Sequence, residues 1–179
     1  MFAVMQGAVT FGFIYSMVLV DEKDTNVAKV YGILPISKFW FVIFRLIPAF
    51  LMATIAAFLI LLAQTFYDLS VISNLIFSAL VGLIAPIMIL FIAIVAKNKI
   101  EAMTWQKLFT IPLYLPIFAF FVPASISFLF GILPSFWAYQ SLDILFKSGN
   151  SFVYLIAGFA LSFLFIYLLV KRFISKHYQ

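Results

Sequence analysis

The chain has no cysteine and very little charge, and these two absences exclude most classes of protein. Without Cys it forms no disulfide and no thiolate metal site. Only 9% of its 179 residues are charged and 66% are hydrophobic, whereas about a quarter of an ordinary soluble domain is charged. A water-exposed globule is therefore excluded, and the composition predicts a chain whose outer surface faces lipid.

Residue patterns that carry chemistry are also absent from the sequence. It has one His, His177, which lies in a basic tail and gives no support to a metal site. We find no paired carboxylates, no Ser-His-Asp set, no zinc spacing and no glycine loop that would hold phosphates. We therefore expect no enzymatic activity and no cofactor or metal in this chain, and any ATP hydrolysis must belong to a partner.

Long uncharged runs predict membrane-spanning helices. A span needs about 20 apolar residues, because the hydrocarbon core is about 30 Å thick and each residue rises about 1.5 Å. The runs are continuously apolar rather than alternating, which argues against strands of an outer-membrane barrel. We predict an all-α polytopic membrane protein, with residues 1–179 forming a single transmembrane domain. About five spans are expected, at roughly 2–20, 42–64, 72–96, 107–122 and 151–170.

The run Leu108–Leu142 is too long for one span and is interrupted. Pro123, Gly131 and Pro134 break it, and its second half is richer in Ser. We predict that the fourth span ends near residue 122. A short helical or re-entrant segment should follow at about 123–146 on the extracytoplasmic side, since irregular backbone at membrane depth is tolerated where protein buries it.

The basic residues predict the orientation. All of them except Lys147 lie in loop 21–38, in loop 97–107, in the C-terminal tail or, for Arg45, just inside a span. With five spans these segments share one side, and Lys and Arg mark the cytoplasmic side. We expect a multi-pass protein with a cytoplasmic C-terminus. The net charge of +5 then reflects orientation, and we expect no nucleic-acid partner.

The segment 21–38 is the most polar part of the chain between apolar runs. Four apolar residues recur there at helical spacing and share one face: Val27, Val30, Tyr31 and Leu34. Asp21, Glu22 and Asp24 suit a helix N-terminus, and Pro35 stops the helix. From spacing alone, two interpretations remain open: docking to a soluble partner, or an amphipathic helix on the membrane surface.

Few polar side chains lie inside the predicted spans. No Asp, Glu, Lys or His lies deep in any of them, which argues against coupling to protons or sodium. The polar candidates are Gln6, Gln64, Ser73, Asn74 and Ser78. We expect them to form interhelical hydrogen bonds or to sit at interfaces, rather than to contact substrate. Gly82 and Pro86 mark either a flexing point in the third span or a local irregularity of packing.

The order of these features resembles a known family. A span is followed by Glu22, Lys23 and Asp24, then by Leu34, Pro35 and Ser37, and then by Arg45 leading into the next span. Three further stretches match in order: Lys97–Met103, Phe120–Pro123 and Phe130–Tyr139. Together they resemble ABC-2 type permeases, the membrane subunits of bacterial ABC transporters, which are usually exporters.

The resemblance implies a function and a set of partners. The chain would be the permease subunit of an ATP-driven exporter in the bacterial inner membrane, paired with a second permease copy or paralogue. A coupling helix would dock each permease onto a cytoplasmic ATP-binding subunit. The residues assigned to that helix are Glu22, Lys23, Asp24, Val27, Val30, Tyr31, Leu34 and Pro35. Loop 97–107 would be either a smaller second contact or, as we favour, a basic anchor.

One departure from the family pattern leaves an alternative open. Such permeases typically have six spans, and this chain resembles spans two to six. We expect an upstream coding segment to supply the missing span. The alternative is a non-transport membrane protein, an immunity factor or an assembly scaffold, derived from a truncated permease. A membrane-embedded enzyme is disfavoured by the absence of clustered catalytic side chains. An ATP-binding cassette gene beside this one would favour the permease.

Overall fold

The structure is a computed structural model that describes residues 1–25, 37–64, 70–147, 149 and 151–177. Across these residues it is helical and contains no strand, which confirms the predicted all-α class. The helices are α1 (Phe2–Asp24), α3 (Lys38–Ala63), α4 (Val71–Gly82), α5 (Ile84–Val95), α6 (Lys99–Tyr114), η1 (Leu115–Phe120), α7 (Ala124–Ser127), η2 (Phe128–Ile132), α8 (Pro134–Phe146) and α9 (Phe152–His177).

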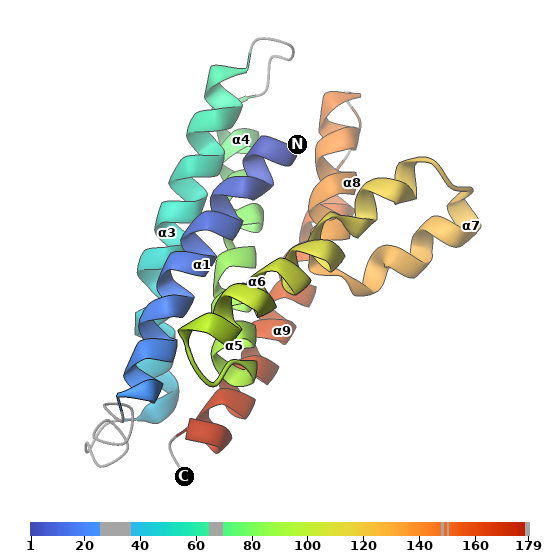
Figure 1. The fold of residues 1–179 in the computed structure, drawn as a ribbon. Helices are drawn as coiled ribbons and strands as arrows, with labels where there is room; N and C mark the ends of the chain where they lie inside the picture. The colour runs from blue at the N-terminus through green and yellow to red at the C-terminus, as the bar shows by residue number, and fades with distance from the viewer. Residues whose placement is uncertain (26–36, 65–69, 148, 150, 178–179) are drawn as a thin grey trace.

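Long apolar helices form the body of the protein. Within the described residues, 4 helices are long and apolar enough to cross a membrane: Phe2–Asp24, Lys38–Ala63, Val71–Val95 and Phe152–Lys176. They correspond to four of the predicted spans. Figure 1 shows them running side by side along the long axis of the molecule, with α4 and α5 following each other as one bent span.

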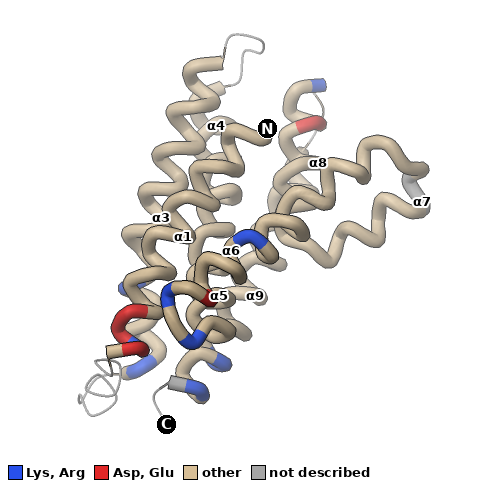
Figure 2. The backbone as a smooth tube through the Cα atoms, viewed as in Figure 1, with Lys and Arg blue, Asp and Glu red and all other residues tan. Residues whose placement is uncertain are grey.

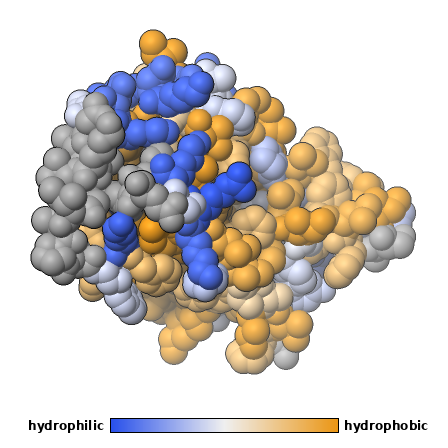
Figure 3. Space-filling model, turned by 90° about the horizontal axis from the view of Figure 1, so that it is seen from below, coloured by the Kyte–Doolittle hydropathy of each residue, from blue (hydrophilic) through white to orange (hydrophobic). Residues whose placement is uncertain are grey.

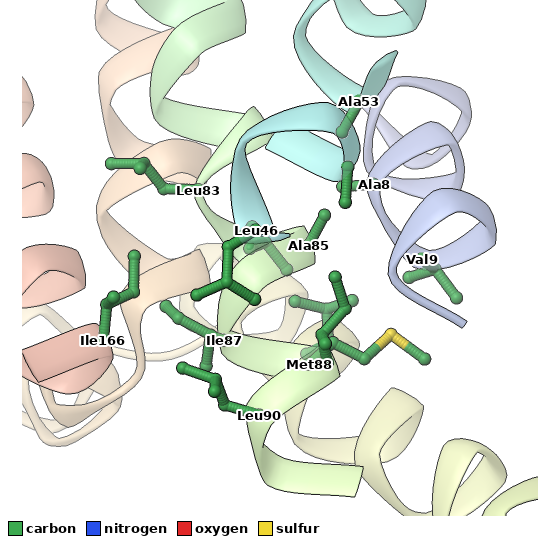
Figure 4. Packing of buried hydrophobic residues seen from close by; sticks show 14 of the residues in the cluster. Ala8, Val9, Leu46, Ala53, Leu83, Ala85, Ile87, Met88, Leu90 and Ile166 are labelled. Carbon is green, nitrogen blue, oxygen red and sulfur yellow. The ribbon is translucent and has the colours of Figure 1, made fainter. Parts of the chain in front are cut away.

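The helix α5 lies at the centre of this bundle, with nearly all of its side chains buried. It packs chiefly against α1 and α9. Small residues bring the backbones close: a Cβ added at Gly12 of α1 would lie 3.1 Å from Met88 Sδ and 3.3 Å from Ala85 Cα. In Figure 4, Ala8 of α1 and Ala53 of α3 lie side by side in the same way. Close backbone approach is the usual source of helix association in lipid.

The third span is broken near its middle, where the sequence places Gly82 and Pro86. The helix α4 ends at Gly82, and α5 begins at Ile84. Pro86 has no N–H to bond the carbonyl of Gly82, which weakens the helix there. A Cβ at Gly82 would lie 2.1 Å from Thr54 Oγ1 and 3.2 Å from the carbonyl oxygen of Phe50. Glycine at this position therefore lets α3 and α4 pack closely.

The predicted fourth span is less regular than the others. The helix α6 ends at Tyr114, and the chain continues as the 3₁₀ helix η1 to Phe120. In Figure 1, α6 climbs obliquely across the bundle rather than along its axis. No helix over residues 107–122 is as long as the four candidate spans above. The span predicted there therefore stays a prediction.

The segment 123–146 is helical, with Pro123 immediately before α7 and Pro134 as the first residue of α8. In Figure 1, the region around α7 projects away from the bundle. The helix α8 returns to pack against α9. The side of the membrane on which this segment lies is still a prediction.

We predict that Gly82→Ala lowers the stability of the bundle. The new methyl group would overlap Thr54 Oγ1 at a packed interface, and overpacking costs about 1–3 kcal/mol. Thermal unfolding of the purified protein in detergent measures the effect. Gly131→Ala is the control, because its Cβ would meet nothing nearer than 3.6 Å. Adding Thr54→Ala should restore much of the lost stability, and an unchanged melting temperature for Gly82→Ala would contradict this account.

Candidate functional site at the charged end of the bundle

Charged residues gather at one end of the bundle, shown at the bottom of Figure 2. We call this the charged end, and it comprises Asp21–Asp24, Lys38, Arg45, Lys97–Glu101 and Lys171–Lys176. Two contacts bring its parts together: Lys99 Nζ lies 2.7 Å from Asp21 Oδ1, and Lys176 Nζ donates to the carbonyl oxygen of Ile94. Described residues from the three segments predicted to face the cytoplasm therefore share one end.

Two lysines hold the C-terminal end of α5 at this site. The last carbonyl groups of a helix have no partner within the helix. Lys23 of α1 donates from Nζ to the carbonyl oxygen of Ala96 at 2.7 Å, and Lys176 of α9 donates to that of Ile94. Cations are also favourable near a helix C-terminus. These bonds join α1, α5 and α9 at the charged end.

An ion pair joins α1 to α3 on either side of the segment 26–36. Arg45 Nη2 donates to Glu22 Oε1. The side chains are only 21% and 19% exposed, so solvent screens the pair less than a fully exposed one. The Arg45 guanidinium also lies 5.4 Å from the centre of the Phe41 ring. The two helices that flank the segment are thus tied together.

The start of α6 is fixed by reciprocal capping. The Asn98 side chain accepts a hydrogen bond from the N–H of Glu101 at 2.9 Å, and the Glu101 carboxylate accepts one from the N–H of Lys97 at 2.9 Å. This arrangement satisfies donors that a helix N-terminus would otherwise leave open. It also holds Lys99 beside Asp21, so this loop forms part of the charged end.

The residues assigned to the coupling helix are only partly covered by the structure. Glu22, Lys23 and Asp24 form the last turn of α1, so their predicted place at the N-terminus of a separate helix is wrong. Glu22 pairs with Arg45, Lys23 bonds the carbonyl of Ala96, and Asp24 is exposed. Five others lie outside the described residues: Val27, Val30, Tyr31, Leu34 and Pro35. The Glu22–Arg45 pair and the bond made by Lys176 were not predicted from the sequence. Opposite charges at the adjoining ends of two consecutive spans were the available signal for the pair.

Seen end-on, the charged end is a hydrophilic patch on a hydrophobic molecule (Figure 3). Orange, hydrophobic surface borders the blue patch on several sides in this view. Within the described part of the chain, no group of three His, Cys, Asp or Glu residues could hold a metal ion. The patch offers charged and hydrogen-bonding groups suited to a soluble partner.

Three of the polar candidates inside the spans, Gln6, Ser73 and Ser78, form local or interhelical hydrogen bonds, whereas the buried side-chain oxygen of Asn74 has no partner among the described residues. Gln6 Oε1 accepts a hydrogen bond from the Tyr114 hydroxyl at 2.9 Å, which links α1 to α6 as the sequence suggested. Ser78 Oγ donates to the carbonyl oxygen of Asn74 at 2.7 Å within α4. Ser73 bonds Ser70 at the start of the same helix. These contacts are structural in character.

Comparison with known proteins identifies the family. Residues 1–170 match the family described as fluoroquinolones export permease protein Rv2686c-like. The chain belongs to the Rv2686c-like family. Two proteins named fluoroquinolones export permease protein, Rv2686c and MT2760 of Mycobacterium tuberculosis, are similar to it. Each is 24% identical over 178 residues, which cover 98% of this chain and 71% of the relative. No solved structure matches the chain.

Membership of the Rv2686c-like family bears on the earlier resemblance. An export permease family is consistent with the predicted ABC-2 type permease. The matched residues include the bundle and most of the charged end, and they stop before Lys176. The family match supports an export permease role, and the match together with the apolar helices supports a multi-pass membrane location.

We predict that charge reversal at Glu22 destabilises the protein and that a swap of the pair rescues it. Glu22→Arg would place two cations together in a poorly solvated site. A hydrogen bond to a charged group contributes about 1.5–3 kcal/mol, so the loss should be of that order. Thermal unfolding of Glu22→Arg, Arg45→Glu and the double variant forms the test.

The ion pair at the opposite end provides a matched control for the swap. Lys147 Nζ lies 2.6 Å from Asp143 Oδ2, and the lysine side chain is 72% exposed. Reversing Asp143 should change the stability by less than about 1 kcal/mol. Failure of the Glu22/Arg45 swap to recover stability beyond the single variants would show that the pair does not tie α1 to α3.

Proposed function

We propose that this chain is the permease subunit of an ATP-driven exporter of small amphipathic drugs, with fluoroquinolones the first compounds to test. The observation that carries the proposal is the family match over residues 1–170. The names of the two Mycobacterium tuberculosis relatives supply the compound class. Because the sequence contains no phosphate-binding loop, we assign ATP binding and hydrolysis to a separate ABC subunit.

We further propose that the charged end faces the cytoplasm of a bacterial cell, across its cytoplasmic membrane. The support is the gathering of Lys and Arg from α1, α3, the start of α6 and α9 at one end of the bundle. Among the described residues, Lys107 lies farther along α6, and Lys147, which follows α8, lies away from the charged end. Cytoplasmic loops carry the excess of basic residues in membrane proteins. The C-terminus is then cytoplasmic, and the start of α1 lies on the far side.

The coupling that we propose uses segment 21–38 as a lever. Both of its ends join helices of the bundle, α1 and α3, which Glu22 and Arg45 tie together. Lys23 carries the connection on to the end of α5, and Lys176 carries it to α9. An ATP-binding subunit that moves the segment would move several helices together. In the working assembly, two permeases would each hold one such subunit and line the route between them.

Export in cells is the direct test of this proposal. The chain is expressed with the ATP-binding subunit from its own host in a strain that lacks drug efflux, and norfloxacin accumulation is measured by fluorescence. We expect accumulation to fall with the wild type. The variant Tyr31→Asp with Leu34→Asp should abolish this effect while the protein still inserts, because charge on the proposed docking face would exclude the subunit.

Controls separate the parts of the proposal. Lys147→Gln, at the end opposite the charged end, should export like the wild type. Co-purification should recover the ATP-binding subunit with the wild type and lose it with the double variant. Unchanged export by the double variant would contradict docking through this segment. Norfloxacin accumulation that is the same with and without the wild-type chain would contradict the proposed cargo.

A further inference from the structure

A groove runs along one face of α6 and η1, away from the charged end. Its volume is about 430 Å³, within the range of about 300–1,000 Å³ that is usual for sites of small molecules. Its lining includes Lys107, Thr110, Ile111, Tyr114 and Phe118. Their spacing places them on one side of the helix. The groove is therefore a continuous strip rather than a set of unrelated side chains.

The two ends of the groove differ in chemistry. Lys107 supplies a positive charge at one end, and Phe118, 61% exposed, supplies an aromatic surface at the other. Between them lie the Thr110 and Tyr114 side chains, whose hydroxyls bond the Gln106 carbonyl and Gln6. Ile111 adds apolar surface. This order suits a ligand with an anionic group at one end and an aromatic body at the other.

Lys107 differs from the lysines of the charged end. Lys23 and Lys176 donate to carbonyl groups, and Lys99 pairs with Asp21. The exposed Lys107 has no hydrogen-bond or ion-pair partner within the described residues. It lies about 12 Å farther along α6 than Lys99, at ~1.5 Å per residue. In Figure 2, a blue segment, which marks Lys or Arg, lies on α6 part-way along the bundle and apart from the charged end.

An exposed lysine without a partner among the described residues, next to apolar and aromatic side chains, can hold a carboxylate through a charge-assisted hydrogen bond. We propose that the groove of α6 and η1 binds an amphipathic aromatic carboxylate, with Lys107 holding the carboxylate and Phe118 contacting the ring system. This inference rests on the proposed function, since it gives the exported compound a place on the chain. Fluoroquinolones carry a carboxylate on a fused aromatic ring and fit the description.

The test measures norfloxacin binding to the full chain in nanodiscs of phosphatidylcholine, a zwitterionic lipid that adds no competing anionic headgroup. Lys107→Met should weaken binding by about tenfold or more, since it removes a charged hydrogen bond to the ligand. Lys107→Arg should retain most of the affinity. Lys147→Met, a lysine outside both the groove and the charged end, is the control and should bind like the wild type.

A second probe distinguishes the two halves of the groove. Decarboxylated norfloxacin should bind the wild type about as weakly as norfloxacin binds Lys107→Met, and Lys107→Met should not weaken it further. Phe118→Ala should weaken both compounds. Thermal unfolding of each variant shows that the protein is intact, and Lys107→Arg keeps the test informative if Lys107→Met proves unstable.

Several results would overturn the inference. Equal binding of norfloxacin to the wild type and Lys107→Met, in protein that exports the drug, would exclude this groove while leaving the proposed function intact. Loss of a dimer in Lys107→Met without loss of binding would assign the face to a contact between two copies. Absence of binding to the wild type, together with absence of export, would overturn the groove and the proposed cargo together.

Discussion

The structure depends on the hydrogen bonds that satisfy the last backbone carbonyl groups at the C-terminal end of α5. Ile94 and Ala96 at this end are buried, so their backbone carbonyl groups must find partners within the protein. At this end the partners are Lys23 and Lys176, which come from the helices on either side of α5. The same two bonds therefore satisfy a helix terminus and join three helices. A displacement of any one of them is opposed by the other two.

Close packing gives the rest of the bundle its rigidity. Gly82 brings α4 against α3 at a distance that leaves no room for a methyl group, and Gly12 brings α1 against α5 at a distance where a methyl group would be tightly packed. The region around α7 is built differently, with Phe121 80% and Phe128 72% exposed. Exposed aromatic side chains pack favourably against lipid or another protein. This region is therefore stabilised by its surroundings, whereas the bundle is stabilised by contacts between its own helices.

Much of the fold could be predicted from the sequence because lipid imposes simple rules. The apolar runs 2–20 and 151–170 correspond to α1 and α9. Both helices continue past these runs into charged residues, and hydropathy alone does not define where they end. The break at Gly82 and Pro86 was visible as two residues that weaken a helix. The groove at Lys107 was not, because the oblique course of α6 depends on tertiary packing, and a lysine at a predicted span end suggests only an anchor.

The central position of α5 has a consequence for how the protein is made. Helices enter the membrane in the order of the chain, and the segment from α6 to α8 is synthesised between α5 and α9. Until α9 arrives, the side of α5 that it covers faces lipid, and Lys176 is not yet present to bond the Ile94 carbonyl. The packing around α5 is therefore complete only after α9 has been synthesised. A ribosome that stalls before α9 would leave inserted helices in which α5 lacks its packing partner α9 and the bond from Lys176.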